Sequence, residues 1–176
     1  PTDLGALSCL PPTRSSLVNA IWGAPGLARS RQSGRLLLGA AITAGSCPAT
    51  PGLCRAPTVS RKASVHLTDR SPDDKDQLGW KWIAGAATTL AELGDPLGSD
   101  DYALCLYDGL DLRAAMKVPA GGTCRGRPCW QQRSNGFIYR NQDAAPHGIT
   151  QLVLKAGGDG KAQMQAKGKG LLLPMP

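Results

Sequence analysis

The chain contains two histidines, and neither lies in a pattern that predicts catalysis. A Ser–His–Asp arrangement needs a histidine that an acid holds next to a nucleophile. His66 falls on the polar side of a predicted strand and His147 falls in a Pro-His-Gly turn, and no nucleophile-elbow motif accompanies either. We therefore interpret both as exposed polar residues. The sequence predicts no catalytic residue, no cofactor and no enzymatic activity.

Two groups of aspartates offer carboxylate oxygens, which are the ligands that calcium prefers. The first group is Asp73, Asp74 and Asp76, and the second is Asp100 and Asp101. The spacing within each group matches no calcium-binding loop. A solvated turn is the simpler interpretation, and a calcium site is the alternative. We therefore predict no metal site.

Three of the four tryptophans are candidates for two different roles. Trp80 and Trp82 alternate with Lys81 in a predicted strand, and Leu78 continues the same apolar stripe. This pattern favours packing in the core, because large aromatic side chains dominate the burial of a small domain. The alternative is stacking on sugar rings, in which Trp80, Trp82 and Trp130 would form the ligand-binding surface of a carbohydrate-binding module.

The six cysteines, at positions 9, 47, 54, 105, 124 and 129, indicate disulfides rather than a metal site. An even number with short spacings is typical of proteins from an oxidising compartment. Zinc would need Cys-x-x-Cys knuckles or clustered histidines, and the short spacings here are Cys-x6-Cys and Cys-x4-Cys. We expect Cys124 and Cys129 to clip a short loop, and Cys47 and Cys54 to close a proline-rich loop.

The segment before Cys47 resembles a bacterial lipoprotein signal, in which the cysteine would be acylated. A basic flank, a short apolar run from Leu36 and small residues precede this cysteine. The pattern departs from such a signal because Ala44 replaces the usual leucine and because the run begins 35 residues into the chain. We favour a short strand or a loose apolar segment.

The basic charge of the chain is concentrated near its beginning. Residues 1–62 carry seven basic residues and one acidic residue, whereas residues 63–176 carry thirteen basic and twelve acidic residues. Of the eight aromatic residues, only Trp22 lies before residue 63. Such a segment buries little apolar surface. We therefore predict a low-order Arg/Pro/Gly-rich segment over residues 1–60 and a folded module over residues 61–176.

The uneven charge also bears on the partners of the protein. Specific binding of nucleic acid needs a basic patch on a folded face, ideally with aromatic residues interleaved. The excess charge here lies in the least structured third, so specific nucleic-acid binding is not predicted. No run of eighteen apolar residues occurs, so no transmembrane segment is predicted.

Short strands separated by turns account for most of the predicted module. The central stretch 101–118 is a hairpin around Asp108-Gly109, and its first strand is apolar on both faces. A second hairpin has its turn at residues 157–160. Further strands are expected over residues 63–68, 77–83, 130–132 and 136–139. The sequence therefore predicts an all-β, antiparallel, sandwich-like domain.

A set of motifs resembles an uncharacterised family of β-rich repeat modules from extracytoplasmic bacterial proteins. The resemblance covers roughly residues 45–176. Its motifs are Lys62-Ala-Ser-Val-His-Leu, Ser71-Pro-Asp-Asp-Lys-Asp-Gln-Leu-Gly-Trp-Lys-Trp82, Gly85-Ala-Ala-Thr-Thr89, Tyr102-Ala-Leu-Cys-Leu-Tyr-Asp108, Val118-Pro-Ala-Gly-Gly-Thr-Cys124, Pro128-Cys-Trp130, Gly136-Phe-Ile-Tyr139 and Gly160-Lys-Ala-Gln-Met-Gln-Ala-Lys-Gly-Lys-Gly170. The resemblance implies a compartment but no activity.

The resemblance also has an implication for Cys105. Such modules usually continue past the Leu-Pro segment into a strand that holds a Cys-Trp pair. The chain ends at residues 171–176, so the resemblance implies that this last strand is missing. The usual partner of Cys105 would then be missing too. We therefore expect an unpaired, buried thiol at Cys105, with Cys9 as its only remaining candidate partner.

Taken together, these features predict an extracytoplasmic protein that is secreted, periplasmic or on the cell surface. The first hypothesis is a non-catalytic structural or interaction module, whose partners are other modules of a surface protein or a polysaccharide. The alternative is the carbohydrate-binding module described above.

Overall fold

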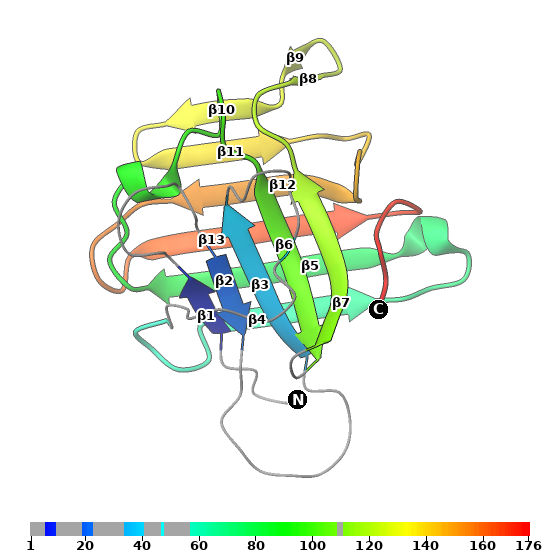
Figure 1. Cartoon of the computed structure of the whole chain (residues 1–176), viewed down its shortest axis with the longest axis horizontal. Helices are drawn as coiled ribbons and strands as arrows, with labels where there is room; N and C mark the ends of the chain where they lie inside the picture. Colours follow the sequence, from blue (N-terminus) through cyan, green and yellow to red (C-terminus); the bar gives the residue numbers. More distant parts are fainter. Residues whose placement is uncertain (1–5, 10–18, 23–33, 41–46, 48–56, 109–110) are drawn as a thin grey trace.

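The computed structural model describes residues 6–9, 19–22, 34–40, 47, 57–108 and 111–176, with the backbone alone for the three strands before residue 47. Apart from one short two-stranded ribbon, the described strands form two antiparallel sheets that pack face to face (Figure 1). In Figure 1 the strands of the smaller sheet run steeply across those of the larger one. The prediction of an all-β, antiparallel, sandwich-like fold is confirmed.

The smaller sheet has five strands in the order β1-β2-β3-β6-β7. These strands are β1 (Ala6–Cys9), β2 (Asn19–Trp22), β3 (Gly34–Ala40), β6 (Tyr102–Asp108) and β7 (Asp111–Val118). Strand β3 pairs along the whole length of β6, and β6 pairs with β7 in the expected hairpin. The sheet therefore joins strands from the first third of the chain to the central stretch, whereas the division at residue 60 stays a prediction.

The larger sheet has six strands in the order β10-β11-β12-β13-β5-β4, which we call the six-stranded sheet. These strands are β4 (Ala63–Thr68), β5 (Gln77–Gly85), β10 (Trp130–Arg133), β11 (Gly136–Arg140), β12 (Ile149–Lys155) and β13 (Ala162–Lys169). The remaining described elements are β8 (Thr123–Cys124), β9 (Arg127–Pro128) and the 3₁₀ turns η1 (Asp73–Lys75) and η2 (Ala91–Leu93).

The core lies between the two sheets and follows from the alternation of residue types along the strands. In β13, Ala162, Met164 and Ala166 are buried, whereas the glutamines and lysines between them lie on the opposite face. Strand β6 differs because all its residues from Tyr102 to Tyr107 are buried, which confirms the prediction of a strand buried on both faces.

The tryptophans occupy the centre of this core. Trp80 and Trp82 are 0% exposed, and Trp130 is 2% exposed and packs between Tyr102 and Tyr139, with both pairs of ring centroids 5.2 Å apart. The indole N–H of Trp130 donates to the Pro119 carbonyl oxygen at 2.8 Å. The prediction that Trp80 and Trp82 are core residues is confirmed.

The disulfides correct two predictions about the cysteines. Cys105 is bonded to Cys47, with 5.8 Å between the Cα atoms. The predicted free thiol at Cys105 is therefore wrong, and so is a Cys47–Cys54 bridge, while Cys54 itself lies outside the described residues. The reason is the strand geometry: Tyr102, Leu104 and Leu106 face the core, so Cys105 points out of the opposite side of the sheet.

The same bond settles the role of Cys47. Its sulfur is in the disulfide, so it is not the acylated cysteine of a lipoprotein. The apolar run before it begins with strand β3, which confirms the interpretation as a short strand. The second predicted bridge, Cys124–Cys129, is confirmed, and none of the cysteines whose side chains are described is free.

Candidate functional site

The outer face of the six-stranded sheet carries basic residues and no acidic ones. Its six strands together contain six basic residues and not one Asp or Glu. The inward positions of these strands are apolar, so alternation places the basic side chains on the solvent side. We call this surface the cationic face; its basic residues are Lys81, Arg133, Arg140, Lys155, Lys167 and Lys169.

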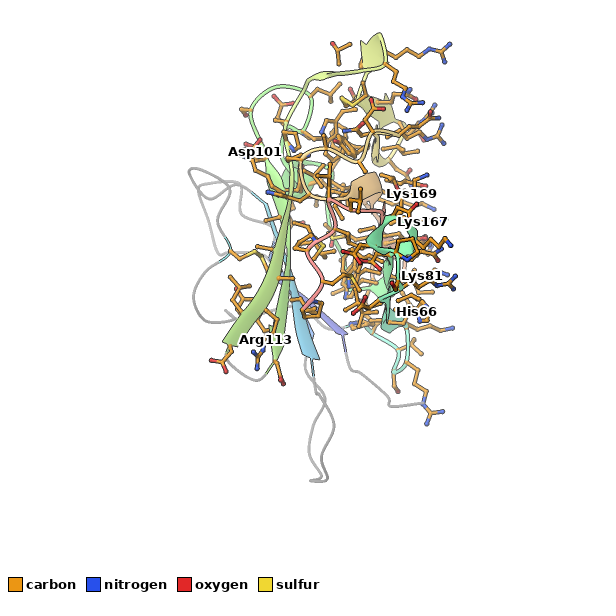
Figure 2. All side chains as sticks on the ribbon, turned by 90° about the vertical axis from the view of Figure 1, so that its right-hand side faces the viewer. His66, Lys81, Asp101, Arg113, Lys167 and Lys169 are labelled. Carbon is orange, nitrogen blue, oxygen red and sulfur yellow. A yellow bond between two sulfur atoms is a disulfide. The ribbon has the colours of Figure 1, made fainter. Side chains whose placement is uncertain are left out.

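The strand register brings three of these lysines together at the β13–β5 junction. Lys167 lies opposite Gly79, and Lys81 lies opposite Gln165, so Lys81 and Lys167 are diagonal neighbours. Lys169 follows Lys167 on the same face. Figure 2 shows these three lysines on one side of the molecule together with His66, whereas Asp101 and Arg113 lie with the other sheet. All three lysines are exposed.

No carboxylate among the described residues neutralises this cluster. The ion pairs between two described side chains join Arg113 to Asp108, Lys117 to Asp101 and Arg125 to Asp143, and none includes a lysine of the cluster. Lys81 and Lys167 are diagonal rather than directly opposite, so their mutual repulsion is weaker than that of a direct cross-strand pair. A partner with negative charge would relieve this repulsion.

Two glutamines lie beside basic residues on the cationic face. Gln151 lies between Lys167 on β13 and Arg140 on β11, and Gln165 lies between Lys81 on β5 and Val153 on β12. An amide side chain offers both hydrogen-bond donors and an acceptor. The face can therefore bind hydroxyl and carboxylate groups at the same time.

A hollow lined by arginines opens at the β10–β11 end of the cationic face. Its volume is about 380 Å³, and its lining is Cys124, Arg125, Arg127, Pro128, Gln131, Arg140 and Gln142. We call it the arginine hollow. Gln131 and Arg140 belong to β10 and β11, so the hollow is continuous with the face. The Cys124–Cys129 bond fixes the loop that forms its other wall.

The arginines of the hollow differ in how they are held. Arg125 donates to Asp143 at 2.8 Å from Nε and to Gln142 at 2.6 Å from Nη1, and the bond and charge of Asp143 raise the pKa of this guanidinium. Arg127 and Arg140 are exposed and make no ion pair with any described residue. Two guanidinium groups thus remain able to bind an anion.

The tryptophans that the sequence offered as a sugar-binding surface are not on the surface. Trp80, Trp82 and Trp130 are all buried between the sheets, so none presents a ring face to solvent. Stacking on a sugar ring requires such an exposed ring. A carbohydrate site built from these three side chains therefore receives no support from the structure.

The two histidines have separate surroundings. His66 is exposed on the cationic face, where its Nε2 lies 3.1 Å from Thr68 Oγ1. His147 accepts a hydrogen bond at Nδ1 from the backbone N–H of Lys117 at 2.9 Å, so it covers part of edge strand β7. Neither histidine has a described hydrogen bond to an acid.

The aspartates that suggested calcium accept hydrogen bonds from the loops instead. Asp76 is buried and accepts the backbone N–H of Arg70 at 2.7 Å, and Asp100 accepts the N–H of Asp95 at 2.7 Å. Among the residues that the structure describes, no three His, Cys, Asp or Glu side chains are gathered to hold a metal ion. The solvated-turn interpretation therefore fits the exposed Asp73 and Asp74.

Asp101 contacts both Lys117 of β7 and Ala120 in the loop that follows this strand. These contacts predict that the stability of the protein depends on pH. Burial raises the pKa of its carboxyl, but the 2.6 Å ion pair with Lys117 and the N–H of Ala120 at 2.8 Å outweigh it, so the net pKa is lowered from 3.8. A lowered pKa adds stability that is complete above 3.8 and is lost as the pH falls through the lowered value.

We therefore expect Asp101→Asn to lower the melting temperature at pH 7, and we expect the difference from the wild type to shrink below about pH 4. Thermal unfolding followed by circular dichroism between pH 2 and pH 8 measures this. Asp159→Asn, in an exposed turn, is the control and should track the wild type throughout. A difference between Asp101→Asn and wild type that stays constant down to pH 2 would contradict the prediction.

The chain was compared with protein-family models, with curated proteins and with solved structures, and no match was found in any of the three. The resemblance to extracytoplasmic repeat modules therefore stays a hypothesis. No helix in the described part of the chain is long and apolar enough to cross a membrane.

Sequence reasoning missed the cationic face because it counted charge along the chain rather than across a sheet. Residues 63–176 are almost neutral in total, yet their acidic residues lie outside the six-stranded sheet. The available signal was the absence of Asp and Glu from every segment that alternates as a strand of this sheet. Only the pairing order shows that these segments share one face.

Proposed function

We propose that this protein is a non-catalytic interaction module of a secreted or surface protein, and that it binds its partner through the cationic face. The observation that carries the proposal is the cluster of Lys81, Lys167 and Lys169, which no described acid neutralises. These exposed like charges repel one another, and no described ion pair offsets that repulsion. A partner with complementary negative charge would offset it.

The disulfides support the compartment. Structural disulfides form and persist in oxidising environments and are rare in the cytosol. Two described bonds, Cys47–Cys105 and Cys124–Cys129, fit a protein that is exported from the cytosol.

The proposal predicts that binding to an anionic polymer depends more on where the positive charges lie than on how many there are. We expect the variant Lys81→Gln/Lys167→Gln/Lys169→Gln to elute from an immobilised sulfated polymer at a clearly lower salt concentration than the wild type. The matched control, Arg70→Gln/Lys75→Gln/Arg113→Gln, removes the same charge from exposed positions outside the strands of the six-stranded sheet and should elute close to the wild type. Salt screens exposed charges, so a salt gradient measures the interaction directly.

Equal shifts for the two triple variants would mean that only net charge matters, and the proposed face would then be wrong. All six substituted positions are exposed, so each variant should fold. Near-ultraviolet circular dichroism of the buried tryptophans checks that the core is unchanged.

A further inference from the structure

We infer that the partner of the cationic face is a linear polysaccharide that carries carboxylate groups and lies across the strands of the six-stranded sheet. This inference rests on the proposed function and adds the chemistry of the partner. Three features of the face support it: the order of its side chains, the burial of every aromatic ring in its strands, and the arginine hollow at its end.

The side chains of the cationic face form rows that cross the strands. One row places Arg140, Gln151, Lys167 and His66 on four strands, with Gly79 between the last two. Adjacent strands lie about 4.8 Å apart. The first three positions of the row therefore alternate charged and amide groups along a line that suits an extended polymer, and Gly79 and His66 continue that line. A polymer of acidic sugars presents carboxylates for the cations and hydroxyls for the amides.

The face lacks the features that single-stranded nucleic acid requires. Bases bind proteins largely by stacking on exposed aromatic side chains. The aromatic residues in the strands of this sheet, which are Trp80, Trp82, Trp130, Phe137 and Tyr139, are all buried. The lysines offer phosphate contacts, but no described aromatic residue of the sheet offers a platform for a base.

A membrane surface fits the face less well. Binding to anionic lipid is strengthened by apolar side chains that enter the bilayer interface. The exposed large apolar residues among those described are Val59, Leu97, Leu112, Leu171 and Leu172, and none lies in a strand of the six-stranded sheet. A hydrated polymer needs no such insertion.

The arginine hollow provides a place for one carboxylate of the polymer. Arg140 belongs both to the cross-strand row and to the lining of the hollow, and Arg127 faces the same space. A guanidinium group binds a carboxylate through two parallel hydrogen bonds, which a lysine does not offer. The row and the hollow thus form one continuous site for an acidic chain.

The test is titration calorimetry of the full disulfide-bonded chain with four probes at one ionic strength. The probes are polygalacturonate, its methyl ester, an oligothymidylate of similar charge and phosphatidylglycerol vesicles. We expect polygalacturonate to bind most tightly, and esterification to weaken binding by about tenfold or more, since it removes the carboxylate charges. The variant Arg127→Gln/Arg140→Gln should lose about tenfold in affinity for polygalacturonate, whereas Arg70→Gln/Lys75→Gln/Arg113→Gln should change it little.

A second variant separates hydroxyl recognition from charge. Gln151→Ala/Gln165→Ala keeps every cation, so it should weaken polygalacturonate binding several-fold while leaving residual binding of oligothymidylate unchanged. Equal losses for both probes would contradict a role for the glutamines in recognising sugar.

The outcomes test separately whether the partner is an acidic polysaccharide and whether the cationic face is the binding surface. If oligothymidylate or the vesicles bind as tightly as polygalacturonate, and the lysine triple variant abolishes that binding, the polysaccharide is the wrong partner but the cationic face stands. If no probe binds, or if the lysine triple variant binds each probe like the wild type, both proposals are wrong. If Arg127→Gln/Arg140→Gln binds polygalacturonate as tightly as the wild type does, the arginine hollow is not part of the binding site.

Discussion

Replacing Trp82 by alanine is expected to lower the free energy of unfolding by about 3–5 kcal/mol. The ring is fully buried, and Trp82 pairs with Ala63 on one side and with Met164 on the other. A Cβ atom on Gly85 would lie 1.9 Å from the ring, so the ring fills the space that this glycine leaves open. Removal of the ring therefore leaves a cavity that the small neighbours Ala63 and Gly85 cannot fill. Urea unfolding of the variant measures the loss.

The control for this variant is its neighbour on the same strand. Lys81 points to solvent, so Lys81→Ala should change the free energy of unfolding by no more than about 0.5 kcal/mol. A Trp82→Ala protein with nearly wild-type stability would show that the ring is not a core residue. If that stable protein had also lost binding to a polysaccharide, the carbohydrate-binding role of the tryptophans would be favoured instead.

The two described disulfides should differ in their contributions to stability. The Cys47–Cys105 bond joins residues 58 positions apart, whereas Cys124–Cys129 joins residues 5 positions apart. The chain-entropy relation then gives a loss of about 4 kcal/mol for Cys47→Ala/Cys105→Ala and of about 2 kcal/mol for Cys124→Ala/Cys129→Ala. Denaturant unfolding of both double variants without reductant gives the two values.

The short bond serves as the internal control, because each variant loses two cysteines and one disulfide. Equal losses would mean that loop closure does not set the stabilisation. Non-reducing peptide mapping provides an independent check of the pairing, and a peptide that links Cys105 to any cysteine other than Cys47 would contradict the structure.

Local patterns in the sequence were sufficient for the hairpins. The Asp108-Gly109 signal predicted the β6–β7 pair, and the glycine-rich turn at 157–160 predicted the β12–β13 pair. Both hairpins join neighbouring segments, so turn chemistry and alternation determine them. The pairing of β13 with β5 and of β3 with β6 joins distant segments, and no local pattern specifies it.

The disulfide of Cys105 also could not be predicted from local patterns in the sequence. Spacing favoured short loops, and the resemblance implied a partner outside the chain. Neither line of reasoning contained the information that β3 lies beside β6, although that pairing brings the chain before Cys47 close to Cys105. The candidate site was hidden for the same reason, since Lys81 and Lys167 become neighbours only through the β5–β13 register.

The separation of charge between the six-stranded sheet and the rest of the described chain gives the molecule a polarity. The acids of the described residues lie in loops and turns or in the smaller sheet, outside the strands that carry Lys81, Lys167 and Lys169. In the field of a negatively charged surface, such a molecule experiences a torque before contact, because its uncompensated positive charge is concentrated on one face. Screening limits this effect to separations of about 8 Å at physiological salt. Within that range, encounters are biased towards arrival with the cationic face first.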